Sequence, residues 1–306
     1  MPTRRRALLA LAAGCLPAAP GFNGSALARS SPPGEAVRVA CTDWTGAETL
    51  LALGIVPAGV IDRAGYDRTM VEPSLPASVV ELGAGWAPNV ELLQYLQPDF
   101  ILIPQWSVRS PQLARIAPVV VLQNRSETLD AIDTAKRQLP ELAERFGAPR
   151  AAQEIITRFD EELQAIRASL STWDDRPIAY LNLNPDGRNV SIATATSLFE
   201  DVARRLGLKN AWGRQANVWS FYVTGVEQLA SIPDARLIYA DQGARTEAAL
   251  RRLADNRIWN SLPAVREGRI SRIPATYAYG SLPTALRLAR MLAQDASRPA
   301  GSPAHG

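Results

Sequence analysis

The chain has 306 residues, a formal net charge of +3 and one histidine, His305. Because that histidine lies at the end of the chain, the composition excludes a Ser-His-Asp triad, a Cys-His pair and a histidine-rich zinc site within the fold. The three arginines at positions 4–6 account for the whole net charge, so the rest of the chain is neutral and lacks the basic block typical of nucleic-acid-binding proteins.

Residues 1–28 are predicted to be a signal peptide that directs export to the periplasm. Arginines 4–6 precede an apolar run at 7–19, and residues 26–28 form a small-residue cleavage pattern. The arginine pair also fits a twin-arginine signal loosely. Lipid attachment at Cys15 is the alternative and is ranked second. Lipid-attachment signals usually have a branched residue three positions before the cysteine, and this chain has Ala12 there. Loss of Cys15 leaves only Cys41, so no intrachain disulfide is expected.

Residues 37–148 are predicted to form a small α/β lobe, because strand and helix patterns alternate along them. The predicted strands are 37–41, a short one near Val60, 78–82, 100–103 and 119–122. The predicted helices are 48–53, 89–96 with Asn89 as its N-cap, 111–116, and 126–146, which is either one helix or a helix pair broken near Pro140. This alternation favours a mostly parallel sheet.

The longest helical pattern, predicted for residues 149–173, divides the chain. Its apolar residues recur every three or four positions and form one stripe: Ile155, Phe159, Leu163, Ile166 and Leu170. Pro149 suits the first turn of this helix. At 1.5 Å per residue such a helix spans roughly 33 Å, enough to connect two lobes. The alternative is an ordinary amphipathic helix within one α/β domain.

Residues 177–296 repeat the same alternation and are predicted to form a second α/β lobe. Strands are predicted at 178–183, 237–240 and 270–273, and helices at 197–206, 227–230, 247–253 and 282–294, with a loop at 259–268. Residues 297–306 are rich in proline, glycine and serine and are predicted to be a disordered tail. In such sheets ligands bind outside the carboxyl ends of the strands, so the loops after the strands are the predicted functional region.

Five segments resemble, in order and spacing, the periplasmic ferric hydroxamate siderophore-binding proteins, of the helical-backbone class of ABC-importer substrate-binding proteins. The segments are residues 51–57, 89–93, 113–118, 217–219 and 272–280, within a match that runs from about 37 to 293. The resemblance implies two α/β lobes joined by one long helix, with a shallow ligand cleft between the lobes and little hinge motion. It also implies delivery of the cargo to an inner-membrane ABC permease.

The resemblance implies a site without catalytic residues, metal ligands or cofactor, because a ferric siderophore saturates its own iron and enters as a complete complex. Aromatic side chains then supply contact area and polar groups fix orientation. Carried over by position, the ligand-binding residues are Trp219, Asn217, Tyr277, Tyr279 and, more approximately, Trp106.

One departure from the family is that its ligand-contacting arginine should fall at 83–86, where this chain has Gly85. A charge-assisted hydrogen bond, which contributes roughly 1.5 to 3 kcal/mol, would then need a replacement. The predicted substitutes are Trp86 and Arg109. The cargo is therefore a different hydroxamate or another iron chelate.

The family docks on its permease through one acidic residue in each lobe. Glu227 matches the second-lobe position, but the first-lobe position holds Gln112. A monomeric periplasmic binding protein for iron transport is the leading hypothesis. The alternatives are a carrier for another iron chelate, haem or cobalamin, and an exported hydrolase acting on a chelate. Against the hydrolase stand the missing histidine and the lack of a Gly-x-Ser-x-Gly elbow.

Overall fold

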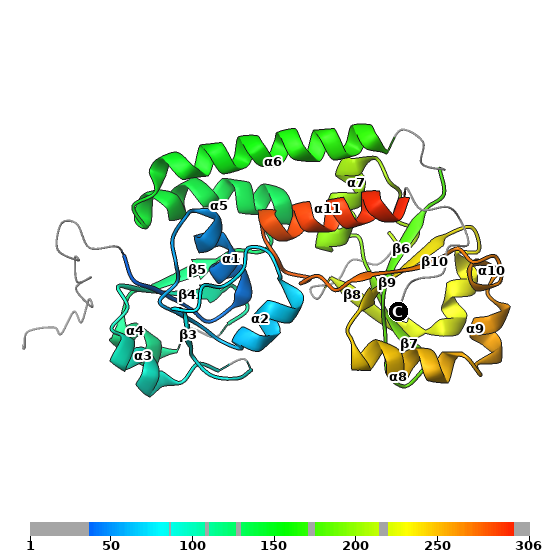
Figure 1. The fold of residues 1–306 in the computed structure, drawn as a ribbon, viewed down its shortest axis with the longest axis horizontal. Coiled ribbons are helices and arrows are strands. Elements are labelled where there is room, and N and C mark those ends of the chain that lie inside the picture. The colour runs from blue at the N-terminus through cyan, green and yellow to red at the C-terminus, as the bar shows by residue number, and fades with distance from the viewer. Residues whose placement is uncertain are drawn as a thin grey trace, which may run out of the picture.

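The computed structural model describes the chain in six ranges: residues 37–85, 87–107, 110–126, 130–170, 175–213 and 220–296. Signal residues 1–28, the tail 297–306 and the end of the predicted 149–173 helix lie outside these ranges. Two five-stranded sheets, each flanked by helices, form two lobes (Figure 1). The predicted α/β fold class is confirmed.

The first lobe contains a wholly parallel sheet of order β3-β2-β1-β4-β5. Its strands are β1 (Val39–Cys41), β2 (Gly59–Val60), β3 (Val80–Glu81), β4 (Phe100–Pro104) and β5 (Val119–Leu122). Its helices are α1 (Trp44–Ala52), α2 (Arg63–Thr69), α3 (Val90–Leu96), α4 (Pro111–Ile116) and α5 (Ala131–Arg145). The central strands β1 and β4 are apolar and buried, as expected for a parallel sheet covered on both faces.

The second lobe contains a mixed sheet of order β10-β9-β6-β7-β8. Its strands are β6 (Ile178–Leu183), β7 (Asn189–Ala193), β8 (Phe221–Gly225), β9 (Arg236–Asp241) and β10 (Ile270–Pro274). Its helical segments are α7 (Leu198–Leu206), the 3₁₀ helix η1 (Val226–Ser231), α8 (Ala244–Leu253), α9 (Arg257–Ser261), α10 (Pro263–Arg266) and α11 (Leu282–Ala296). The three strands β6, β9 and β10 are parallel, whereas β7 and β8 run antiparallel to their neighbours.

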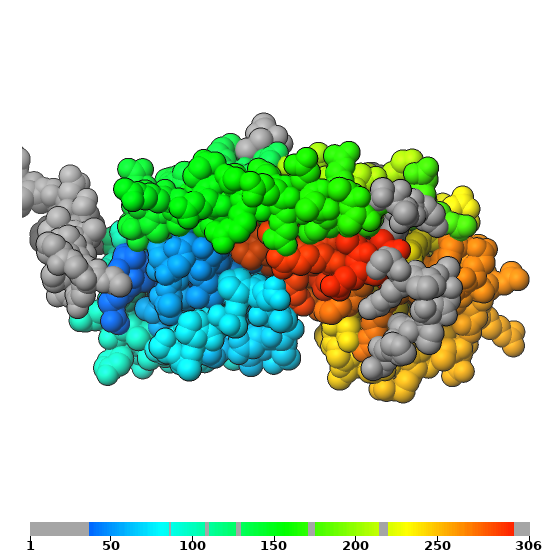
Figure 2. All heavy atoms as spheres, turned by 45° about the horizontal axis from the view of Figure 1, so that its top comes forward, coloured from blue at the N-terminus to red at the C-terminus, as the bar shows by residue number. Residues whose placement is uncertain are grey.

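The helix α6 (Pro149–Ser169) lies across both lobes, with α5 and α11 packed beneath it (Figure 1). Its predicted apolar stripe faces these helices, and Phe159 is almost completely buried there. Figure 2 shows α6 and α11 as neighbouring ridges that cover the junction between the lobes. The two lobes therefore share one continuous hydrophobic core along α6.

Several local features were left open or missed by the sequence analysis. Pro140 does not break α5, because it lies on the exposed face, where water can reach the carbonyl four residues earlier. Leu139 and Leu142 keep the buried stripe of α5 continuous.

The strand β7 was missed, although the Asp186-Gly187 turn before it is a hairpin signal. The Asp186 side chain accepts hydrogen bonds from two backbone N–H groups, and Gly187 has a φ of 63°. The helix α2, the strand β8 and the short helices α9 and α10 were also missed.

A buried carboxylate of the first lobe caps the last helix of the second. Glu48 of α1 accepts hydrogen bonds from the backbone nitrogen of Ser281 and from both the backbone nitrogen and the hydroxyl of Thr284, the latter at 3.2 and 2.8 Å. The first N–H groups of any helix lack partners within the helix, so this contact satisfies the beginning of α11. Burial raises the pKa of Glu48 to about 8, although the bonds from Ser281 and Thr284 oppose the shift.

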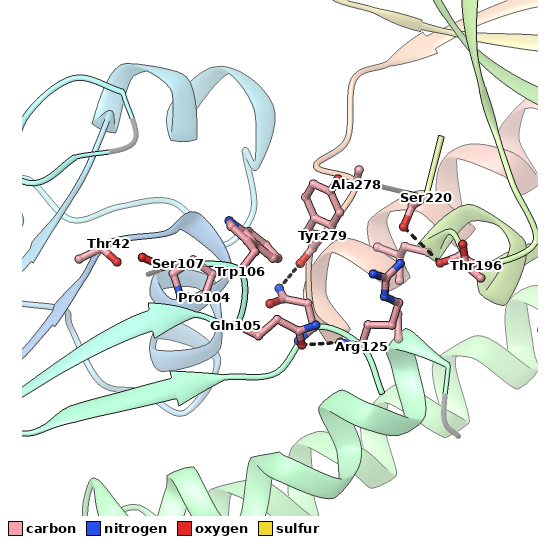
Figure 3. Close-up of a pocket in the computed structure, with 13 residues that line it drawn as sticks. Thr42, Pro104, Gln105, Trp106, Ser107, Arg125, Thr196, Ser220, Ala278 and Tyr279 are labelled. Carbon is pink, nitrogen blue, oxygen red and sulfur yellow. Dashed lines mark hydrogen bonds between the residues drawn. The ribbon is translucent and has the colours of Figure 1, made fainter. Parts of the chain in front are cut away.

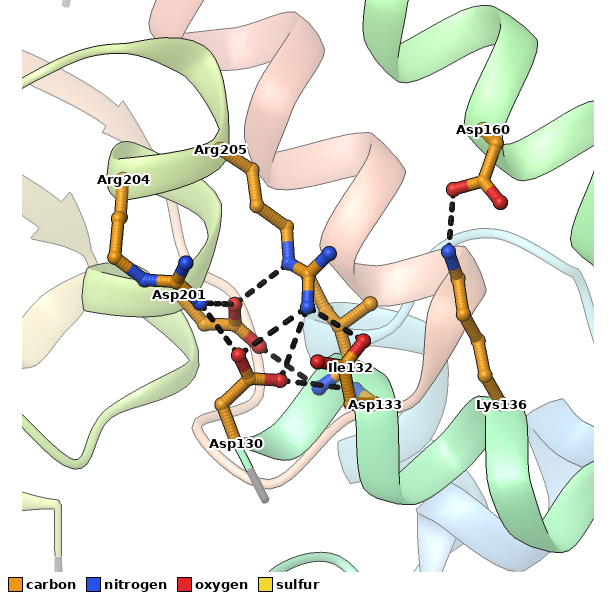
Figure 4. Close-up of polar contacts among 8 residues, drawn as sticks. All are labelled: Asp130, Ile132, Asp133, Lys136, Asp160, Asp201, Arg204 and Arg205. Carbon is orange, nitrogen blue, oxygen red and sulfur yellow. Dashed lines mark hydrogen bonds and ion pairs between the residues drawn. The ribbon is translucent and has the colours of Figure 1, made fainter.

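A second junction joins α5 to α7 through a cluster of charges (Figure 4). The Arg205 guanidinium contacts three carboxylates, Asp133 and Asp201 at 2.7 Å and Asp130 at 3.2 Å. Arg204 also pairs with Asp130 and Asp201 but is more exposed. Burial and a hydrogen bond with Asp130 raise the pKa of Asp201 to about 6. These charges fix the beginning of α5 against the second lobe.

We predict that Glu48→Gln flattens the pH dependence of stability. The pKa of Glu48 is raised above its unfolded value, so the folded protein binds more protons, and this group's stabilisation is lost as pH rises from about 4.5 to about 8. Urea unfolding at about pH 5 and about pH 8 should show a decrease on the order of 3 kcal/mol in the wild type that the variant lacks. Glu91→Gln, at an exposed carboxylate of α3, should keep the wild-type profile. Identical profiles for the wild type and Glu48→Gln would contradict this role.

We predict that Arg205→Met lowers the free energy of unfolding by about 2 to 4 kcal/mol, because it leaves the nearly buried Asp201 without its main counter-charge. The matched variant Arg204→Met should cost under about 1 kcal/mol, because that side chain is 55% exposed. Chemical denaturation near neutral pH measures both. Equal losses in the two variants would show that the junction does not depend on Arg205.

Candidate functional site

A cavity of about 540 Å³ lies at the junction of the two lobes (Figure 3). Its lining is Thr42, Pro104, Gln105, Trp106, Ser107, Asn124, Arg125, Ala131, Thr196, Leu198, Ser220, Ala278 and Tyr279. The volume lies within the range usual for small-molecule sites. Both lobes contribute to the lining.

The first-lobe part of the cavity lies where the order of the parallel sheet reverses. The chain passes from β1 outward to β2 and β3, then returns to β4 on the other side of β1. The connections after β1 and β4 therefore leave in opposite directions and open a crevice at the carboxyl edge of the sheet. Thr42 follows β1, Gln105 and Trp106 follow β4, and Arg125 lies in the connection after β5. The prediction that the functional region lies in the loops after the strands therefore agrees with the position of the cavity in this lobe.

The second-lobe part is built differently. Thr196 and Leu198 follow β7, and Ser220 precedes β8, so these residues lie at the amino edge of β6. The Ser220 hydroxyl donates to the carbonyl of Thr196 at 3.2 Å, which holds the two connections together (Figure 3). Of the described second-lobe residues that line the cavity, Ala278 and Tyr279 are the ones that come from a segment after a parallel strand, β10.

Trp106 and Tyr279 form an aromatic pair on the cavity wall. Their ring centroids are 4.7 Å apart with an interplanar angle of 49°, and Trp106 comes from the first lobe while Tyr279 comes from the segment after β10. Trp106 is 38% exposed, an unusual degree for a large aromatic side chain in a folded domain. The pair presents apolar, rigid surface to the cavity.

Tyr277 does not line this cavity. It is 9% exposed, packs edge-on against Tyr279 and donates its hydroxyl hydrogen to Asp43 at 3.0 Å. It lines a smaller cavity of about 100 Å³ beside Asp43, Trp44 and Gly85. Tyr277 therefore packs against the Tyr279 ring without lining the larger cavity itself.

The carbonyl of Tyr279 is held by the first lobe. Asn124 Nδ2 donates to it at 2.7 Å, and the Thr45 hydroxyl donates to it at 2.8 Å. Asn124 Oδ1 is left without a hydrogen-bond partner within the part of the chain that the structure describes, and so is the Thr42 hydroxyl.

Arg125 extends from the first lobe toward Thr196 and Ser220 (Figure 3). Its backbone nitrogen and that of Asn124 both donate to the Gln105 side-chain carbonyl, at 3.2 and 2.9 Å, so the connections after β4 and β5 brace each other. Burial raises the pKa of the Tyr279 hydroxyl, and the positive charge of Arg125 opposes that shift. Arg125 thus places a cation beside the aromatic wall.

Of the predicted site residues, the structure brings Trp106 and Tyr279 together on one wall. Asn217, Trp219, Trp86 and Arg109 lie outside the described residues. Glu227, the predicted docking residue, is exposed in η1, at the end of the second sheet opposite to Ser220.

The sequence analysis missed Thr42, Asn124, Arg125, Thr196 and Ser220. Thr42, Asn124 and Arg125 each lie within three residues of the end of a predicted strand, so a stricter use of the carboxyl-edge rule would have found them. Thr196 and Ser220 carried no such signal, because the strands β7 and β8 were not predicted.

The described residues contain no group of three or more His, Cys, Asp or Glu side chains that could hold a metal ion. Within the same ranges, none of the helices has the length and apolar character needed to span a membrane. Cys41 is completely buried, and burial raises the pKa of its thiol, so it stays neutral.

One protein-family model matches this chain, and proteins with known functions and solved structures are similar to it. The model of a family described as periplasmic binding protein matches residues 39–277. The iron(3+)-hydroxamate-binding protein FhuD of Escherichia coli (strain K12) is 30% identical over 256 residues, which cover 83% of this chain and 85% of that protein.

Two solved structures extend the likeness. The Fe³⁺-Desferal-bound siderophore-binding protein FhuD from Vibrio cholerae is similar with a TM-score of 0.75 and 27% identity, over 86% of this chain and 98% of that one. The triscatecholate siderophore-binding protein FeuA from Bacillus subtilis, complexed with ferri-bacillibactin, shares the fold with a TM-score of 0.65 and 20% identity, over 84% and 92% of the two chains.

Proposed function

The chain belongs to the periplasmic binding protein family, and we propose that it binds a ferric siderophore of the hydroxamate type and delivers it to an inner-membrane ABC permease. The relatives named above support this proposal, because one is a ferric hydroxamate-binding protein and another was solved with an iron-loaded siderophore. The protein then serves iron transport, and the iron enters only inside its chelate.

The observation that carries the proposal is the chemistry of the cavity. Its wall combines the Trp106–Tyr279 pair with hydroxyl and amide groups and offers no carboxylate among the described lining residues. Such a surface suits the organic shell of a complete iron complex, for which aromatic area and a few orienting hydrogen bonds suffice. It does not suit a bare metal ion, which needs several oxygen, nitrogen or sulfur ligands at short distance.

The same chemistry supports a carrier and not an enzyme. Among the residues described, the cavity holds no pairing of a nucleophile with a base, which a covalent mechanism needs, and no pair of carboxylates for acid–base work. We propose that the mature protein is a monomer in the periplasm, without cofactor and without nucleic acid as a partner.

Contact with the permease is proposed through Glu227, which is exposed at the surface of the second lobe. Asn217, Trp219, Trp86, Arg109 and Tyr277 stay predicted ligand contacts on the strength of the resemblance. Export by the twin-arginine route, with lipid attachment at Cys15 as the alternative, stays a prediction as well.

We predict that Trp106→Ala and Tyr279→Ala each weaken binding of a ferric trihydroxamate about tenfold or more, because each removes rigid aromatic area from the cavity wall. Isothermal titration calorimetry suits the measurement, since Trp106 is itself a fluorophore that the substitution deletes. Tyr95→Ala is the matched control: this aromatic side chain of α3 is 83% exposed and lines no part of the cavity.

The wild type should bind one iron-loaded chelate per chain and bind the iron-free chelate more weakly. Failure of the folded wild type to bind any member of a ferric hydroxamate panel would remove the proposed function. Binding that is unchanged in both aromatic variants, with circular dichroism intact, would place the ligand elsewhere on the protein.

A further inference from the structure

Ser220 has a backbone conformation that serine rarely adopts. Its φ is 64°, in the left-handed region where a Cβ atom crowds the following carbonyl oxygen. Four non-glycine residues of the described ranges have a positive φ, and of these Ser220 is the one that lines the cavity. Asp62 and Gln97 cap the short helices α2 and α3, and Val71 lies in the connection between α2 and β3. The unfavourable conformation at Ser220 therefore coincides with the candidate site, where such residues tend to occur.

The carbonyl and the hydroxyl of Ser220 both bond to the connection between β7 and α7. The carbonyl accepts a hydrogen bond from the Thr194 backbone nitrogen at 3.0 Å, one residue beyond the paired parts of β7 and β8. The hydroxyl donates to the Thr196 carbonyl at 3.2 Å (Figure 3). Ser220 thus joins β8 to a segment that lines the cavity with Thr196 and Leu198.

A network of hydroxyl groups continues from this bond to the beginning of α7. The hydroxyl oxygens of Thr194 and Thr196 lie 3.2 Å apart, and the Ser197 hydroxyl donates to the Thr194 carbonyl at 2.7 Å. The same Ser197 oxygen accepts a hydrogen bond from the Glu200 backbone nitrogen at 3.0 Å and so caps α7. The bond from Ser220 to Thr196 therefore connects β8 to the network that fixes the beginning of α7.

The stability of the fold does not account for a serine at this position. Glycine adopts a positive φ without the steric cost that a Cβ atom adds. The hydrogen bond of the hydroxyl offsets a cost of similar size, so serine and glycine leave the folded state about equally stable. What the serine adds is its bond to Thr196, which removes freedom from the second-lobe wall before a ligand arrives.

We propose that Ser220 is a positioning residue for the cargo, whose hydroxyl holds Thr196 and the beginning of α7 in the shape that receives a ferric hydroxamate. The inference rests on the proposed function. The hydroxyl hydrogen of Ser220 is used in the bond to Thr196, and the iron-binding oxygens of a hydroxamate are acceptors. Ser220 therefore acts through its neighbours and not by donating to the cargo.

The test compares Ser220→Gly and Ser220→Ala in the full mature chain. Both variants lose the hydroxyl, but only alanine keeps a Cβ atom at the positive φ. Thermal unfolding should therefore place the glycine variant within about 2 °C of the wild type and the alanine variant about 2 to 4 °C lower. Titration calorimetry with Fe³⁺-Desferal and with ferrichrome should show that both variants bind about fivefold more weakly than the wild type.

Thr224→Ala is the matched control. Thr224 is another hydroxyl residue of β8 and lines no part of the cavity, so this variant should bind like the wild type. Amide hydrogen exchange gives a second measurement of the wall. Residues 194–200 should exchange faster in the ligand-free glycine variant than in the ligand-free wild type, and the difference should shrink when a chelate is bound.

The outcomes separate the two proposals. A folded wild type that binds neither chelate contradicts the proposed function. If the wild type binds and the glycine variant binds equally well, Ser220 serves only the fold and the positioning role is wrong. A glycine variant that binds more weakly with unchanged exchange at 194–200 would mean that the hydroxyl contacts the ligand itself, which also overturns the proposal. If the alanine variant does not fold, the glycine variant alone decides.

Discussion

The arrangement of the molecule depends on how residues 277–284 of the second lobe dock into the first. This segment leaves β10, crosses the junction and begins α11, and along its length first-lobe groups satisfy its polar atoms. Asp43 receives the Tyr277 hydroxyl, Asn124 and Thr45 hold the Tyr279 carbonyl, and Glu48 caps α11. Separating the lobes would exchange these hydrogen bonds for bonds to water, at a net cost of about 0.5 to 1.5 kcal/mol for each. The docked segment therefore opposes large hinge motion.

A preformed cavity follows from this docking. Tyr279 belongs to the second lobe by sequence, yet its place is set by Asn124 of the first lobe, and its ring packs against Trp106 of the first lobe. The charge cluster around Arg205 fixes the same junction from the side of α5 and α7, and Ala131 and Leu198 of those two helices form part of the lining. The cavity wall and the lobe packing thus share residues. A binding site assembled in this way needs little ordering when the ligand arrives.

The sequence was sufficient for the fold class and for part of the site. Periodicity identified α6, because an amphipathic stripe over 21 residues is a strong signal, and alternation identified the parallel strands. The alternation of strands and helices did not identify β7 and β8. These are short antiparallel strands, and no helix separates β6 from β7. The loop after β5 is a different case: the carboxyl-edge rule points to Asn124 and Arg125, but the bond that ties this loop to Gln105 joins positions 20 residues apart, and no local pattern records it.

Burial sets the ionisation of the acids at the lobe junction. Burial raises the pKa of Glu48 to about 8, so near neutral pH this carboxyl is mostly protonated, and burial also raises the pKa of Asp43. The cost of taking a carboxylate out of water thus opposes ionisation of both acids, although hydrogen bonds from Thr45 and Tyr277 act the other way at Asp43. The two parts of the junction are therefore joined in different ways: the docked segment is held mainly by hydrogen bonds to buried acids, whereas α5 and α7 are held by charge pairs around Arg205.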